Sequence, residues 1–112
     1  MEGPCIRRFP RIVMNKAIDL NAGNTAIHLD SAGGNLSIGG LYLETEGPPE
    51  GSPVHLRIEG SRPVELDGVI RYCKTDGERG VGIEFMLADG NREGLYQLIA
   101  ELTKDEIGRA HV

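Results

Sequence analysis

Three arginines stand close together near the start of the chain and could bind an anion. Arg7, Arg8 and Arg11 fall within five positions of a sequence whose formal net charge is -5. A guanidinium group is a flat fork of donors that can hold a phosphate, or the O6/N7 edge of guanine, through two hydrogen bonds. A solvated basic segment would carry the same residues, because clusters of one charge sign often remain in water. The arginines alone leave both interpretations open.

A second group of chemically useful residues follows further along the chain. Asn35 and Ser37 are two positions apart, which in an extended segment places their amide and hydroxyl on the same side. Gly39 and Gly40 allow a tight turn, or a close approach of the backbone to a ligand. An ordinary turn stabilised by the Asn or Ser side chain has the same composition. This group therefore also has a purely structural interpretation.

The sequence carries no signature of an enzyme or a metal centre. His28, His55 and His111 are scattered, with no cysteine or carboxylate at ligand spacing beside them. It contains no phosphate-binding loop, dinucleotide-binding fingerprint or nucleophile elbow. Cys5 and Cys73 form no CxxC pair, and Cys73 fits a small apolar strand residue better than a nucleophile. We therefore expect no catalytic residues, no metal and no cofactor.

Length and composition predict a single globular domain. The 112 residues are 39% hydrophobic and 26% charged, which is typical of a folded chain of this size. No apolar run approaches the roughly 18 residues that would span a membrane, and the N-terminus lacks the apolar core of a signal peptide. The acidic balance disfavours binding to a nucleic acid polymer. We expect a cytoplasmic protein with free thiols and no membrane insertion.

The elements that must position these residues are mostly strands. Apolar residues alternate in several short runs separated by turn residues, which is typical of antiparallel sheets. Asn21–Asn24 and Asp76-Gly77 have turn chemistry, and 30–34 reads as a bend or bulge. Short strands joined by turns favour a small antiparallel barrel. The expected strands are 12–20, 25–29, 41–45, 54–58, 64–72 and 80–85, with Met14, Ile18, Leu20, Val64, Leu66 and Ile70 as inward-facing residues.

The apolar period then changes to that of a helix. Leu95, Leu98, Ile99 and Leu102 recur at spacings of three and four, which places them on one helix face. The spacing predicts a helix at about 90–106 that caps or flanks the barrel. Asp89 or Asn91 can cap its start, and Gly108 is expected to follow its end.

Taken in order, the motifs resemble those of the PilZ domain family of bacterial receptors for the second messenger cyclic di-GMP. Arg7-x-x-x-Arg11 followed by Asn35-x-Ser37-x-x-Gly40 is similar to the paired signature of that family. Three further runs resemble its strands: 36–43 its LSxGGLxL run, 64–72 its GxVxR strand and 80–85 its GxGVxF strand. The resemblance covers about residues 6 to 103.

The resemblance implies an all-β fold with one C-terminal helix, built on a six-stranded antiparallel barrel. It also implies two parts: a flexible ligand-clamp segment at 1–11, and one barrel domain at 12–112. Arg7 and Arg11 would bind guanine edges and phosphates, with Arg8 assisting, while Asn35 and Ser37 would hydrogen-bond a guanine. Gly39 and Gly40 would leave room for the ligand next to the backbone. Arg71 is either a further base contact or a solvated strand arginine.

Two departures from the family pattern bear on binding. Asn35 stands where many members have Asp, so it brings no negative charge to a guanine. Ile6 stands where some members have another arginine, which favours one ligand per domain.

Two functions follow from this resemblance. The first is a stand-alone cyclic di-GMP receptor, without enzyme activity, whose arginine segment changes conformation on binding and signals to an unidentified effector protein. The alternative is a protein-interaction adaptor of the same family that does not bind the nucleotide.

Overall fold

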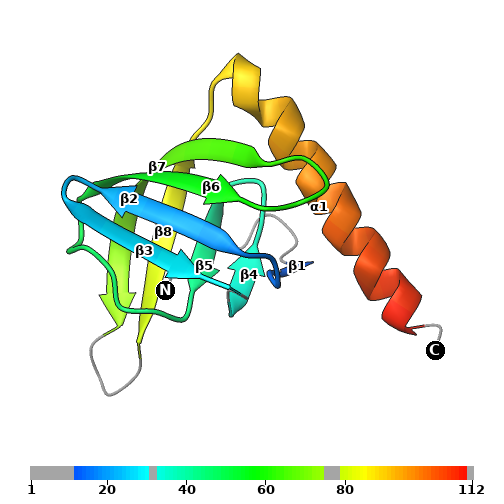
Figure 1. Cartoon of the computed structure of the whole chain (residues 1–112), viewed down its shortest axis with the longest axis horizontal. Coiled ribbons are helices and arrows are strands. Elements are labelled where there is room, and N and C mark those ends of the chain that lie inside the picture. Colours follow the sequence, from blue (N-terminus) through cyan, green and yellow to red (C-terminus); the bar gives the residue numbers. More distant parts are fainter. Residues whose placement is uncertain (1–11, 31–32, 75–78, 111–112) are drawn as a thin grey trace, which may run out of the picture.

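The computed structural model describes residues 12–30, 33–74 and 79–110. Within these ranges the chain forms eight strands followed by one helix (Figure 1). The elements are β1 (Ile12–Val13), β2 (Ile18–Ala22), β3 (Thr25–Leu29), β4 (Gly34–Leu36), β5 (Gly40–Leu43), β6 (Pro53–Ile58), β7 (Val64–Lys74), β8 (Gly80–Met86) and α1 (Asp89–Ala110). No helix among the described residues is long and apolar enough to cross a membrane.

The described strands form one curved antiparallel sheet, in the order β1-β4-β5-β8-β7-β6-β2-β3 (Figure 1). The expected mainly β fold with a C-terminal helix is confirmed. The expected six-stranded closed barrel is wrong, because the sheet has eight strands and β1 and β3 remain its edges.

The two additional strands arise at places where alternation of apolar residues was a poor guide. The predicted strand 12–20 is divided, since β1 pairs with β4 while β2 pairs with β3 and β6 at the other end of the sheet. The segment 34–36, expected to form part of a bend and turn, is strand β4. Alternation reveals which side chains face inward, but it does not reveal which strand each segment will pair with.

The core lies on the concave side of the sheet, and the predicted inward residues are confirmed. Met14, Ile18, Leu20, Leu66 and Ile70 are each at most 1% exposed. The remaining buried apolar residues come from β1, β4, β5, β6, β7, β8 and the helix, whereas the apolar residues of β3 are only partly buried. They are Ile12, Leu36, Leu41, Leu43, Val54, Leu56, Ile58, Val64, Val81, Ile83, Phe85, Leu95, Leu98 and Leu102.

Helix α1 packs against β7 and β1 through its predicted apolar face. Leu95, Leu98 and Leu102 are buried, and Ile99 packs beside them. Asn91 caps the start as expected, because its side-chain oxygen accepts the N–H of Ala88 at 2.9 Å.

The predicted end of the helix is wrong, since α1 continues through Gly108 to Ala110. A glycine disfavours a helix interior by only about 1 kcal/mol. It therefore cannot end a helix that other residues support.

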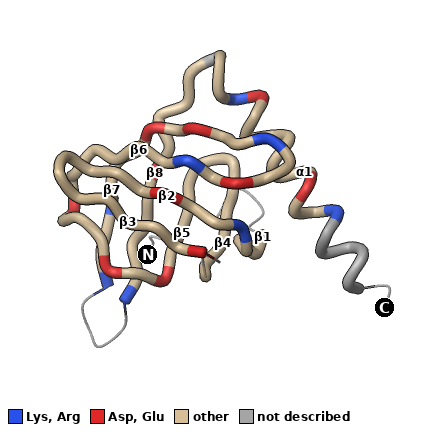
Figure 2. Tube along the Cα trace, in the orientation of Figure 1, with Lys and Arg blue, Asp and Glu red and all other residues tan. Residues whose placement is uncertain are grey.

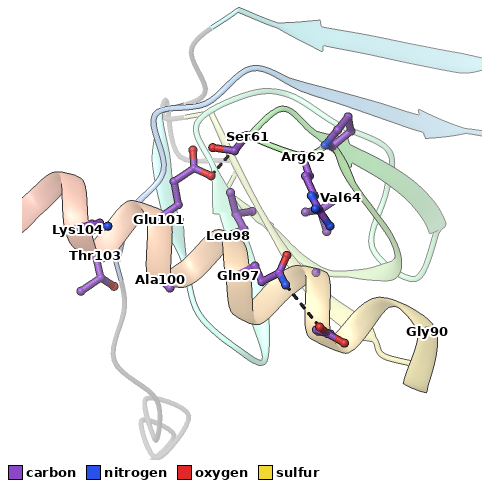
Figure 3. A pocket seen from close by; sticks show the side chains of 13 residues that line it. Ser61, Arg62, Val64, Gly90, Gln97, Leu98, Ala100, Glu101, Thr103 and Lys104 are labelled. Carbon is purple, nitrogen blue, oxygen red and sulfur yellow. Dashed lines mark hydrogen bonds between the residues drawn. The ribbon is translucent and has the colours of Figure 1, made fainter.

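One carboxylate joins α1 to two distant segments. Glu101 accepts the N–H of Ser61 at 3.0 Å (Figure 3). The same carboxylate pairs with Lys16 at 3.0 Å. The Ser61 N–H, and then Lys16, hold the pKa of Glu101 below its ordinary value. A groove between α1 and the segment 61–64 runs beside this contact (Figure 3).

Candidate functional site

Asn35 lies on the outer face of the sheet. It occupies the middle of β4, and its neighbour Leu36 is fully buried, so the alternation of the strand turns Asn35 away from the core. Asn35 pairs in register with Val13 on one side and Tyr42 on the other. The amide therefore belongs to a row of outward residues that crosses several strands.

Ser37 and Gly40 close the turn between β4 and β5. The N–H of Ser37 donates to the carbonyl of Gly40 at 2.9 Å, and the Ser37 hydroxyl lies 3.4 Å from the same oxygen. The latter contact is long for a hydroxyl donor, so it is a weak bond. Ser37 is only 6% exposed. Its hydroxyl thus stabilises the turn, and its lone pairs can still accept a hydrogen bond.

This turn is held tightly against β8. Gly39 accepts the N–H of Phe85 at 3.1 Å. A Cβ at Gly40 would lie 2.4 Å from the carbonyl oxygen of Ile83, which is a backbone atom with little freedom to move. Glycine is therefore required at Gly40 by packing within the sheet, in addition to any room that it leaves for a ligand.

Arg71 projects from the same face, two strands away from β5. A β-bulge between Ile70 and Tyr72 interrupts the register of β7 with β8, and both Arg71 and Tyr72 are exposed. The guanidinium of Arg71 donates to Glu84, which pairs in register with Gly40. This outer face thus contains a carboxylate, that of Glu84, which competes with any anionic ligand for Arg71.

A pair of tyrosines, one on β5 and one on β7, lies on the same outer face. The rings of Tyr42 and Tyr72 are stacked with centroids 6.4 Å apart and planes 23° from parallel. The ammonium of Lys74 lies 4.9 Å from the Tyr42 ring centroid, within the range of a cation–π contact. Sequence reasoning missed these residues and Glu84. Their outward alternation beside buried neighbours such as Leu41 and Leu43 was the available signal.

The structure places Asn35, Gly40 and Arg71 on one outer patch over β4, β5, β8 and β7, and it places Ser37 and Gly39 in the turn that joins β4 to β5 at the edge of this patch. Ser37 is buried there, so a ligand would meet it only from the side of the turn. Arg7, Arg8 and Arg11 lie outside the described residues, so their predicted roles stay predictions.

Cys73 of β7 is a free, half-buried thiol packed beside the core. Its sulfur donates to the carbonyl of Pro48 at 3.4 Å. These surroundings suit the small apolar residue expected there.

A second polar cluster occupies the outer face of β3, β2, β6 and β7. His28 binds Asp19 at 2.5 Å and Asp30 at 2.8 Å. His55 binds Asp67 at 2.9 Å and Glu65 at 2.8 Å. These are carboxylates that sequence spacing alone did not associate with the histidines.

The hydrogen bonds raise the pKa of each imidazole. Asp19 and then Asp30 raise the pKa of His28, and Asp67 and then Glu65 raise the pKa of His55. No group of described side chains is arranged to hold a metal ion. Acidic and basic residues are interspersed over the strands (Figure 2).

The model of the PilZ domain family matches residues 6–101. No curated protein matches the chain.

Two solved structures share the fold. Bacillus subtilis inhibitor of motility, MotI/DgrA, superposes with a TM-score of 0.68 at 20% identity, over 92% of this chain and 53% of its own. Escherichia coli YcgR in complex with c-di-GMP superposes with a TM-score of 0.74 at 15% identity, over 94% of this chain and 49% of its own. The chain thus spans about half the length of these two structures.

Proposed function

The chain belongs to the PilZ domain family, and on this premise we propose that it is a cyclic di-GMP receptor that signals to a partner protein. The observation that carries the proposal is the shared patch. The family motif residues Asn35 and Gly40 lie on the same outer face as Arg71, and Ser37 lies in the turn between Asn35 and Gly40. The complex of E. coli YcgR with c-di-GMP, a protein of the same fold, supports this ligand.

Three of the predicted site residues suit a dianionic guanine dinucleotide. The amide of Asn35 can exchange hydrogen bonds with the edge of a guanine, and Ser37 can accept a further one. Arg71 presents a guanidinium that matches both phosphate and guanine O6/N7. Arg7 and Arg11, assisted by Arg8, would complete the site from the segment 1–11. A change in the conformation of that segment on binding would create a new surface for the effector protein.

This function needs no catalytic step. Cyclic di-GMP acts as a ligand, and binding energy rather than chemistry drives the change of conformation. We place the receptor in the cytoplasm and assign it one ligand per domain.

Isothermal titration with cyclic di-GMP tests the proposal. Arg7→Ala and Arg11→Ala should each weaken binding by about 2 kcal/mol, because each removes a charge-assisted contact. Arg92→Ala, which removes an exposed arginine from α1, is the matched control and should bind as the wild type does. Cyclic di-AMP should not bind, since adenine lacks the O6 acceptor. A folded wild-type protein that shows no binding at tens of micromolar would contradict the proposal.

The alternative, an adaptor that does not bind the nucleotide, is favoured by one observation. Arg71 is already paired with Glu84, so this part of the patch is neutralised. Amide spectra distinguish the two functions. A receptor should show shifts over 33–43 on addition of the dinucleotide, and a nucleotide-independent adaptor should show none.

A further inference from the structure

We propose that Tyr72 stacks a purine base of the bound dinucleotide, and that Tyr42 and two glycines of β8 hold its ring in place for this contact. The proposal rests on the proposed function and adds an aromatic subsite to it. Aromatic rings bind nucleobases by stacking in a manner that tolerates any base, because every base has a π-face.

The rings lie where β8 lacks side chains. A Cβ at Gly82 would lie 2.2 Å from the Tyr72 ring, and a Cβ at Gly80 would lie 2.1 Å from the Tyr42 hydroxyl. Both tyrosines therefore extend over the bare backbone of β8 from its two sides. Their strands are two spacings apart, or about 10 Å, yet the ring centroids are only 6.4 Å apart.

Tyr72 is the ring available to a base. It is 46% exposed, although it packs against a glycine-rich strand and another ring. Lys74 lies beside the Tyr42 ring, at 4.9 Å from its centroid, so that ring already has a cationic partner. Lys74 also adds positive charge beside the subsite, where a phosphate of the ligand can meet it.

The subsite is separate from the guanine contact at Asn35. Asn35 is on β4 and Tyr72 is on β7, three strand spacings apart across β5 and β8. That separation is about 14 Å between backbones, which a single base does not span. A dinucleotide carries two bases, so one can meet the amide of Asn35 while the other stacks on Tyr72. Arg71 precedes Tyr72 on the bulge and is placed to contact the same base or its phosphate.

The structure offers a matched control for this ring. Tyr96 on α1 is 47% exposed, nearly the same as Tyr72, but it lies away from the patch. Tyr72→Leu should weaken cyclic di-GMP binding by roughly 5- to 150-fold, the range that base stacking on an aromatic residue contributes. Tyr72→Phe keeps the π-face and should bind within about twofold of the wild type, as should Tyr96→Leu.

Ring proton spectra of the wild-type protein provide a readout that needs no variant. Stacking should shift the Tyr72 ring resonances on addition of cyclic di-GMP and leave those of Tyr96 unchanged. Thermal unfolding of each variant without ligand shows whether it is folded, so a loss of structure is not taken for a loss of stacking.

The outcomes separate this proposal from the one on which it rests. Wild-type binding with a selective defect in Tyr72→Leu and shifted Tyr72 resonances supports the subsite. Wild-type binding with unshifted Tyr72 resonances, and with Tyr72→Leu equal to Tyr96→Leu, overturns the subsite and leaves the receptor function standing. No binding by the folded wild type overturns both.

Discussion

Glu84 is the residue that most limits the electrostatics of the patch. Its carboxylate accepts the guanidinium hydrogen of Arg71, and it lies directly across from Gly40 in the sheet. A phosphate that approaches Arg71 must compete with this carboxylate and is repelled by it. Replacing this carboxylate with a neutral amide should therefore favour the binding of an anionic ligand.

We expect Glu84→Gln to bind cyclic di-GMP up to about fivefold more tightly, because an exposed ion pair contributes about 1 kcal/mol or less. The matched control is Glu59→Gln, which neutralises an exposed carboxylate paired with Arg57 outside the patch. Titration of both variants with the dinucleotide provides the measurement. Weaker binding by Glu84→Gln would show instead that Glu84 positions Arg71 for the ligand.

Packing within the sheet, and not only ligand binding, restricts which residue can occupy position 40 of the family motif. A Cβ at this position would lie 2.4 Å from the backbone oxygen of Ile83. Gly40→Ala must therefore displace β5 from β8, which should destabilise the fold by about 1–3 kcal/mol. Urea unfolding measures the change. Gly90→Ala is the control, because a Cβ at this position meets nothing within 4 Å, and it should be neutral or slightly stabilising. An equal loss of unfolding free energy in both variants would show that the contact with Ile83 is not the cause.

At the scale of elements, polar contacts of Glu101 attach α1 to the rest of the fold, besides the apolar face of the helix. Glu101 receives the N–H of Ser61 and the ammonium of Lys16, from segments that are distant in the sequence. The lowered pKa of Glu101 means that its charged form is favoured by folding. This contribution is present above the ordinary pKa and is lost as the pH falls through the lower pKa of the folded state.

Glu101→Gln should lower the free energy of unfolding by about 1 kcal/mol at pH 7. The difference from the wild type should shrink as the pH falls below the ordinary value of 4.5. Urea titrations at pH 7 and at pH 3 to 4 measure it. Glu93→Gln on the same helix, which loses only a long contact to Gln97, is the control. A deficit that does not change with pH would show that the charge of Glu101 is not what matters.

At the scale of the whole molecule, the outer face is divided into two polar regions. One is the candidate ligand patch over β4, β5, β8 and β7. The other holds His28 and His55, each between two carboxylates, with Arg57 bound to Glu65 close by. We expect the second region to make the stability of the fold depend on pH.

Both imidazoles have a raised pKa in the folded protein. The folded state therefore binds protons more tightly than the unfolded chain, and the stability is fully present below the ordinary pKa of 6.5. It is lost as the pH rises through the higher folded values. Wild-type protein should unfold at lower urea at pH 8 than at pH 6. The double variant His28→Gln with His55→Gln should show a smaller difference in stability between pH 6 and pH 8. An equal difference in the wild type and the double variant would show that the two histidines do not cause the pH dependence.

The sequence predicted the inward face of nearly every element, because alternation and helical spacing follow directly from which residues avoid water. Met14, Ile18 and Leu66 are buried as expected, and α1 begins beside its capping residue Asn91. The sequence did not predict that 12–20 would divide between two ends of the sheet. Strand partners are set by contacts between distant segments, which local alternation does not encode.

For the candidate site, the residue types and the order of the motifs could be identified from the sequence. Asn35, Ser37 and Gly40 could be named as one group, and their family could be inferred, because ligand chemistry depends on side-chain type and spacing. Only the tertiary structure placed Glu84 against Arg71, and only the tertiary structure brought the rings of Tyr42 and Tyr72 over two glycines of β8. These contacts join residues of different strands, so they exist only once the register of the sheet has been set.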